Sequence, residues 1–306
     1  DIDSLAVPTA TLLHQPRTRP SATRGPILPD FDIRIGSLTI GRLMLAAPVL
    51  GQPRVARIAA QADIRSGRAL VRIDGVVAGS DRLRLRIDAE PDRDRFDIDV
   101  AALGRRGGLL SRLSGIARDV RLTVTGDGRW ARWRGTARAQ AGTAMLGDLT
   151  LAADAGRYTL AGVVAPAPYL TGKLQRMATP RVLVNGSATY ANRRVDGAIS
   201  LRSAALAIDT TGVVDLAANA YRNVRITARL LRPAALFPNM TGRDIRLRAI
   251  LDGSFARAAF DYRIDAARFA FDKTGFEAAH LVGKGRLSAA PVMIPARFTA
   301  ARVTGV

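Results

Sequence analysis

Apolar and polar residues alternate with period 2 along most of the chain, and residues 83–100 show the pattern most clearly. This is the period of a β-strand, in which successive side chains point to opposite faces of the sheet. Arginine and aspartate occupy the positions between the apolar ones, and a short polar turn separates the two arms. The segment therefore predicts a β-hairpin with one charged face and one apolar face. The apolar face would carry Leu83, Leu85, Ile87, Phe96, Ile98 and Val100.

The charges also predict a register for this hairpin, because opposite charges on facing strands attract and a one-residue slip would exchange the two faces. The pairs expected on the charged face are Asp88 with Arg95, Arg86 with Asp97, and Arg84 with Asp99. The pairs expected on the apolar face are Ile87 with Phe96, Leu85 with Ile98, and Leu83 with Val100.

Similar alternation continues to the end of the chain, with turn residues at intervals of about ten, as in a long antiparallel meander. The further predicted strands are 68–78, 119–126, 158–165, 181–191, 195–203, 223–231, 245–253 and 259–271. Only residues 107–120 and 232–240 have a helical pattern, and both are too short to cover a sheet of roughly twenty strands. The predicted fold class is all-β: a long curled antiparallel sheet of many short strands that forms a groove, with one or two short helices.

The first residues of the chain recur in altered form after a proline-rich stretch. Ile2, Ser4, Leu5, Val7 and Leu12 recur as Ile35, Ser37, Leu38, Ile40 and Leu45. A repeated strand unit suggests a stack of similar elements. Within the second copy the alternation slips at Gly36 and again at Gly41, which predicts β-bulges there.

These features suggest a domain organisation. Residues 1–30 would hold the strand repeat and a linker that contains Pro16, Pro20, Pro26 and Pro29. Residues 31–306 would form an elongated β-repeat region, subdivided near 102–118, 166–180 and 232–242. No stretch approaches the roughly 18 to 20 apolar residues of a membrane span. We expect the chain to be a piece of a longer protein, since it begins at Asp1.

The composition of the chain limits the kinds of partner that it can be expected to bind. The 306 residues include 46 basic and 26 acidic ones, a net charge of +20 that favours anionic neighbours. Many arginines alternate with acids along the strands, however, and aromatic residues make up only 5% of the chain. Proteins that bind single-stranded nucleic acid need aromatic stacking platforms, so we expect no nucleic-acid partner. The absence of cysteine excludes disulfides and thiolate metal sites.

Catalytic residue types are scarce, and we expect no enzyme activity and no cofactor. The only histidines are His14 and His280, and no G-x-S-x-G motif accompanies them. The aspartates at 92, 94, 97 and 99 alternate with arginines, which favours a charge ladder over a calcium loop. A G-x-G-x-x-A match at Gly126 precedes another predicted strand, whereas a dinucleotide fingerprint opens a helix. No metal site is expected either.

The apolar face needs a cover, because its area would exceed what a soluble monomer leaves exposed. A second sheet, closure into a barrel, or an apolar ligand in a curled sheet would each provide one. Composition alone favours a sandwich, and the unbroken succession of hairpins favours one curled sheet. On the residues alone, burial of the six hairpin residues in a protein core is the stronger interpretation.

Three stretches resemble the TamB family, the inner-membrane subunits of the translocation and assembly module within the AsmA-like superfamily. They are IRIGSLTIGRLMLAAPVLG (33–51), DRLRLRIDAEPDRDRFDIDVA (81–101) and GGLLSRLSGIARDVRLTVTGDGRWARWRGTARAQAG (107–142). The most specific feature is TGDG followed closely by WRG. The resemblance covers residues 1–165, and from there to residue 306 it rests on general β-repeat character.

The resemblance implies a β-taco, a curled sheet with an apolar groove, in the periplasm of a Gram-negative bacterium. The full-length protein would be anchored in the inner membrane and would work with an outer-membrane Omp85-type barrel, through parts absent from this chain. It would support outer-membrane protein assembly and secretion, and the passage of phospholipids between the two membranes. The six hairpin residues would then face phospholipid acyl chains. The alternatives are a structural β-sandwich or β-solenoid scaffold that binds no lipid and, as a minor one, a nucleic-acid binder.

Overall fold

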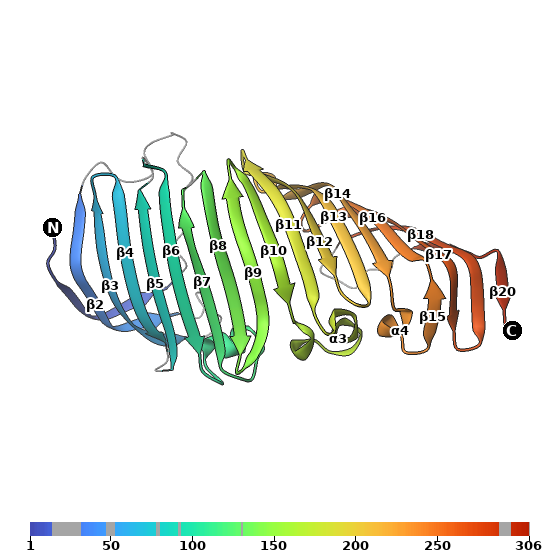
Figure 1. Cartoon of the computed structure of the whole chain (residues 1–306), viewed down its shortest axis with the longest axis horizontal. Helices are drawn as coiled ribbons and strands as arrows, with labels where there is room; N and C mark the ends of the chain where they lie inside the picture. The colour runs from blue at the N-terminus through green and yellow to red at the C-terminus, as the bar shows by residue number, and fades with distance from the viewer. Residues whose placement is uncertain are drawn as a thin grey trace. The chain divides into compact units, whose positions relative to one another are not determined.

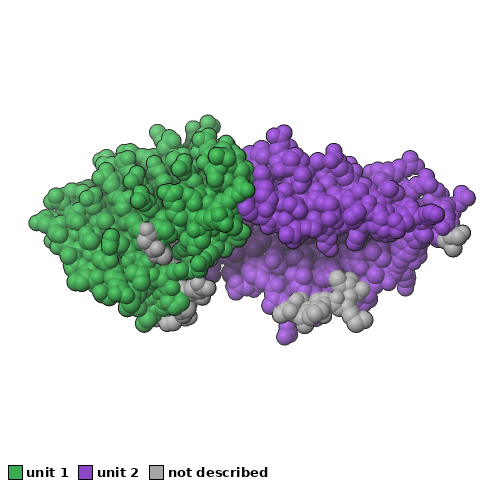
Figure 2. Space-filling model, turned by 90° about the horizontal axis from the view of Figure 1, so that it is seen from below, with its two compact units in different colours: residues 1–155 green, residues 156–306 purple. Residues whose placement is uncertain are grey.

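The computed structural model describes residues 1–13, 32–46, 53–77, 80–90, 93–129, 131–287 and 295–305. The predicted linker prolines, His14 and the turn residues Pro91 and Asp92 lie outside the described residues. The predicted fold class is confirmed: in the described part of the chain the strands form one long, open sheet of twenty strands, and the helices there are all short. The chain divides into two compact units, residues 1–155 and residues 156–306 (Figure 2).

Unit 1 is a meander in which each strand from β2 onward pairs with the next, as its neighbouring arrows show (Figure 1). A five-residue helix, α2 (Leu109–Leu113), follows β6. The strands are β1 (Leu5–Leu12), β2 (Ile33–Leu45), β3 (Arg54–Arg65), β4 (Arg68–Val77), β5 (Asp81–Glu90), β6 (Arg95–Gly104), β7 (Val120–Gly128), β8 (Arg132–Ala141) and β9 (Ala144–Asp154).

Unit 2 is also built from antiparallel strand pairs, but β14 pairs with β16, β15 with β17, and β18 with both β19 and β20. Its strands are β10 (Arg157–Val164), β11 (Val182–Ala191), β12 (Arg194–Arg202), β13 (Leu206–Asp215), β14 (Ala220–Leu230), β15 (Met240–Arg243), β16 (Ile245–Ser254), β17 (Ala259–Phe271), β18 (Thr274–Arg286), β19 (Ala296–Thr299) and β20 (Arg302–Thr304). Its helical segments are η2 (Ala167–Tyr169), α3 (Gly172–Ala178) and α4 (Pro233–Leu236).

The repeat found in the sequence is a structural repeat. β1 and β2 are parallel, and Ile2, Leu5, Val7 and Leu12 pair with their counterparts Ile35, Leu38, Ile40 and Leu45. The register between β2 and β3 shifts after Ile35 and again after Ile40, which confirms the predicted bulges. The bulge glycines bring β2 close to β1. A Cβ atom added to Gly36 would lie 2.6 Å from the carbonyl oxygen of Asp3.

The helices agree with the expectation only in part. Those at α2 and α4 lie inside the two predicted stretches, and Pro233 opens α4 as proline does at first helical positions. The prediction missed α3, which spans seven residues. The stretches 102–118 and 232–242 contain α2 and α4, and the stretch 166–180 contains both η2 and α3. Among the described residues, no helix has the length and apolar character needed to cross a membrane.

Candidate functional site

The hairpin β5–β6 forms as predicted, but the predicted register was wrong: the observed register differs from it by two residues. Glu90 pairs with Arg95, Ile87 with Ile98, and Leu85 with Val100. The reason is Pro91. The predicted register leaves a two-residue loop, whose favoured turns need a positive φ at the first position, and proline fixes φ near −65°. The shift is even, so the six apolar residues keep one common face.

The charged face consequently forms different ion pairs. Arg68 of β4 donates two hydrogen bonds to the Asp88 carboxylate, at 2.8 and 2.7 Å. The predicted contact between Asp88 and Arg95 is present at 3.5 Å, but Arg95 lies closer to Asp97, at 2.9 Å. Arg84 pairs with Asp74 of β4 instead of Asp99. The side chain of Asp88 is 3% exposed, and hydrogen bonding from Arg68 holds the pKa of its carboxyl below the ordinary value.

The apolar face of the hairpin is part of a pattern that crosses unit 1. Cross-strand partners align into rows, and every residue of two such rows is apolar or glycine. One row consists of Leu38, Ala60, Ile73, Leu85, Val100, Val124, Ala137 and Leu149. The next consists of Ala62, Val71, Ile87, Ile98, Gly126, Gly135 and Leu151. Alternation therefore produces a continuous apolar face from β2 to β9.

Unit 2 has an apolar row of the same kind, which the sequence pattern alone did not reveal. It consists of Gly162, Val184, Leu201, Ile208, Ala228, Leu247, Ile264, Leu281 and Phe298. Each strand shows the alternation by itself, but the row becomes visible only when the register of every strand pair is known. Near its end, Phe269 stacks on Phe276 with ring centroids 4.9 Å apart.

These faces are only partly covered by protein. Leu83 is 41% exposed, and the other five predicted site residues are half-buried. None of the six is among the buried residues, and most of the buried apolar residues in the described part of the chain are alanines. In unit 2 the only cluster of buried residues is built on Met240 and Ile245, again counting described residues alone. Figure 2 shows a hollow along the face of unit 2 that is turned toward the viewer, whereas the face of unit 1 in that view is filled.

The residues of the TGDG and WRG motif pack against one another in the structure. Gly126 and Gly135 are cross-strand partners, and the indole of Trp133 lies over both. A Cβ atom added to Gly126 would lie 2.0 Å from an indole carbon, and one added to Gly135 would lie 2.4 Å from another. Trp133 also contacts Phe96, with ring centroids 6.2 Å apart. The motif thus places two aromatic rings at one end of the apolar face. Trp130 lies outside the described residues.

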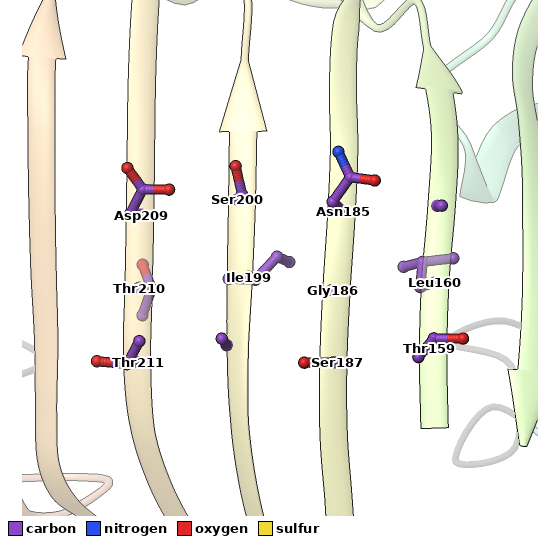
Figure 3. Close-up of a pocket in the computed structure, with 12 residues that line it drawn as sticks. Thr159, Leu160, Asn185, Gly186, Ser187, Ile199, Ser200, Asp209, Thr210 and Thr211 are labelled. Carbon is purple, nitrogen blue, oxygen red and sulfur yellow. The ribbon is translucent and has the colours of Figure 1, made fainter. Parts of the chain in front are cut away.

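Unit 2 also has a shallow depression of about 390 Å³ across β10 to β13, lined by polar side chains and by Leu160 and Ile199. Asn185, Ser200 and Asp209 lie at one level of it, and Thr159, Ser187 and Thr211 at another (Figure 3). The Asp209 carboxylate accepts two hydrogen bonds from Arg202, at 2.6 and 2.7 Å. The depression offers hydroxyl and amide groups, but its one carboxylate is already engaged.

Candidate catalytic groups do not converge. The Nδ1 atom of His280 lies 2.6 Å from a carboxylate oxygen of Asp265 on the polar face, and Arg263 donates to the same carboxylate at 2.7 Å. No serine or threonine hydroxyl is a hydrogen-bond partner of His280 in the described part of the chain. No group of three or more histidine, aspartate or glutamate side chains positioned for a metal ion occurs among the described residues.

No known family model, curated protein or solved structure matches the chain. The site must therefore be interpreted from its own chemistry: a long apolar face on one side of the sheet, and paired charges on the other.

Proposed function

We propose that this chain is the central periplasmic part of an envelope protein of the TamB family. Its apolar face would hold phospholipid acyl chains and guide them between the inner and outer membranes of a Gram-negative bacterium. In the full-length protein this activity would support outer-membrane protein assembly and secretion, together with an Omp85-type barrel. The inner-membrane anchor and the contacts with the barrel would belong to parts outside this chain.

The observation that carries the proposal is the incomplete cover over a continuous apolar face. A sandwich would bury large side chains between two sheets, whereas Leu85 and Val100 stay half-buried and Leu83 is exposed. An acyl chain on this face would leave water at about 0.8 kcal/mol per CH₂ group. The charged headgroup would stay at the open edge. Such a mechanism is passive and needs no catalytic group.

Native mass spectrometry and lipid extraction on the protein purified from a Gram-negative periplasm would test the proposal. We expect phospholipid to co-purify at a fixed stoichiometry. Leu85→Asp combined with Ile98→Asp should abolish it while the β-sheet circular dichroism spectrum persists, because two carboxylates on the face oppose acyl chains. A matched variant, Thr39→Asp with Thr150→Asp, adds the same charge at exposed positions of the polar face and should keep the lipid.

Other outcomes would favour the second candidate, a lipid-free structural scaffold. A wild-type protein that is monodisperse, cooperatively folded and free of lipid would mean that protein covers the apolar face. Equal lipid loss in both double variants would mean that the lipid is held by net charge and not by the face.

A further inference from the structure

A second pocket lies in unit 1 on the face opposite Leu85. It has a volume of about 340 Å³ and lies near one end of strands β3 to β7. The cross-strand row Arg57, Val76, Arg82, Leu103 and Arg121 borders it, and so does the adjacent row Ala59, Asp74, Arg84, Ala101 and Thr123. Cations and apolar side chains thus alternate along one row. In the adjacent row the small residues Ala59, Ala101 and Thr123, here called the floor, lie on either side of the Asp74–Arg84 ion pair.

Three of these arginines lack counterions. Arg57, Arg82 and Arg121 are exposed and have no carboxylate or hydrogen-bond partner within the part of the chain that the structure describes. The fourth arginine of the pocket, Arg84, is paired with Asp74 at 3.1 Å.

The acids near this end of the strands are already engaged. Asp81 accepts hydrogen bonds from the backbone N–H groups of Arg105 and Leu110, at 3.1 and 2.7 Å. Asp119 pairs with Arg105 at 2.7 Å. The positive charge around the pocket is therefore uncompensated, in contrast to the network around Asp88 on the same face.

The distance between arginines on alternate strands would let two arginine side chains bind the same anion. Neighbouring strands lie about 4.8 Å apart, so arginines on alternate strands have Cα atoms about 10 Å apart. Two long arginine side chains at that distance can converge on a single phosphate, which the planar guanidinium binds in bidentate fashion. Val76 and Leu103 separate the arginines and offer apolar contact beside the anion.

We propose that this pocket binds an anionic amphiphile, with a phosphate group between Arg82 and a neighbouring arginine and an apolar portion against Val76, Leu103 and the alanine floor. A bare anion would not use the apolar floor. The pocket lining contains no aromatic side chain, so it lacks the stacking platform of a single-stranded nucleic-acid site. Most residues of the pocket lie on the other face from the proposed acyl-chain path, although Leu83 and Ala102 of the apolar face also border it.

Isothermal titration calorimetry with water-soluble short-chain lipids tests this site. Dihexanoyl phosphatidic acid should bind the whole chain, while dihexanoyl phosphatidylcholine and inorganic phosphate should each bind at least tenfold more weakly. Arg82→Gln should weaken phosphatidic acid binding by roughly ten- to a hundredfold, because it removes a charge-assisted bidentate contact. Arg82→Lys should retain part of the affinity.

Two controls show whether the binding belongs to this pocket. Arg134→Gln removes the same charge from an exposed position of the same face on β8 and should leave the affinity unchanged. The Leu85→Asp, Ile98→Asp variant disables the proposed acyl-chain path and should still discriminate phosphatidic acid from phosphatidylcholine.

Three results would overturn the proposal. Inorganic phosphate that binds as tightly as phosphatidic acid would show that the apolar floor is not used. Equal affinity for both lipids would remove the role of the anionic head. Equal losses in Arg82→Gln and Arg134→Gln would assign the binding to net charge.

Discussion

At the scale of single residues, the charged face depends on a few carboxylates that are almost completely buried. Asp88 in unit 1 and Asp215 in unit 2 each have a side chain that is 3% exposed, and each contacts two arginines. For Asp215, a hydrogen bond from the Ala218 N–H and another from Arg222 hold the pKa below the ordinary value. Buried charge is tolerated here because every carboxylate oxygen has donors.

The pH dependence of stability should reveal the Asp88 network. A carboxyl whose pKa is lower in the folded state stabilises the fold above its unfolded-state pKa, about 3.9, and this contribution disappears as the pH falls through the folded-state value. Asp88→Asn should therefore lower the free energy of unfolding at pH 7 by about 1 to 3 kcal/mol. Urea denaturation across pH 2 to 7 should show a shallower acid dependence for the variant. Parallel curves for the two proteins would refute this role.

A second feature at the scale of single residues is the packing of Trp133 over Gly126 and Gly135. The Trp133 ring occupies space that any side chain at either glycine would fill. The indole N–H is buried and has no hydrogen-bond partner in the described part of the chain. Packing, and not hydrogen bonding, therefore fixes the ring in place. A motif that resembles a family signature in the sequence has a steric role in the structure.

Substitutions at this motif should separate sterics from hydrogen bonding. Gly126→Ala should cost about 1 to 3 kcal/mol, because the added methyl group overlaps the ring and lies 2.8 Å from the Arg134 carbonyl oxygen. Trp133→Phe should cost less than about 1.5 kcal/mol, since no hydrogen bond is lost. The free energy of unfolding would be measured by chemical denaturation for each single variant. It would also be measured for Trp133→Leu and for the double variant Gly126→Ala, Trp133→Leu. If Gly126→Ala costs as much in the Trp133→Leu background as in the wild type, the ring contact is not the cause.

At the scale of elements, the β1–β2 pair shows how a sequence repeat becomes a structural one. Equivalent residues of the two copies become parallel neighbours, and the bulges at Gly36 and Gly41 let the backbones approach. The Gly36 N–H donates to the Ile2 carbonyl at 2.9 Å, so this contact closes the start of β1.

Hydrogen exchange should report the consequence of filling the bulge. Gly36→Ala brings a methyl group to 2.6 Å from the Asp3 carbonyl oxygen, and we expect faster exchange of the β1 amides, by about tenfold or more, with β4 to β6 unchanged. Gly186→Ala is the matched control, because a methyl group there meets its nearest atom at an ordinary 3.6 Å. Similar exchange in β1 for both variants and the wild type would mean that Gly36 is dispensable.

Much of the element pattern could be predicted from alternation alone. The strand at 259–271 has the predicted bounds, and those at 68–77 and 182–191 agree to within one residue at each end. Strands rich in alanine, such as β3 and β9, gave no distinct signal. The hairpin register could not be derived from charge pairing, because Pro91 excludes the shorter turn and Arg68 of another hairpin binds Asp88.

That the six hairpin residues share one face could be predicted from the alternation, and the structure places them so, half-buried or exposed. That they face acyl chains stays a prediction. Their membership in rows that cross eight strands depends on registers that local patterns do not encode. The unpaired arginines of the second pocket likewise emerge only when it is known which carboxylates other groups engage.

At the scale of the whole molecule, one rule accounts for both units: period-2 alternation over many hairpins places apolar residues on one face and charged residues on the other. Few large side chains are fully buried in the described part of the chain, so the stability of each unit rests on half-buried rows and strand pairing. An apolar face of this length left in water would favour aggregation, which is why a bound apolar ligand is central to this account.

Photocrosslinking inside the full-length protein in living bacteria tests that claim most directly. A photoreactive phenylalanine analogue would replace Leu85 or Val100 on the apolar face of unit 1, Ile208 or Ile264 on that of unit 2, and Arg134 or Thr150 on the polar face. With phospholipids radiolabelled in the headgroup, we expect lipid adducts at the four apolar positions and none at the two polar ones. Adducts to protein alone at the apolar positions, or equal lipid labelling on both faces, would contradict the proposed acyl-chain path.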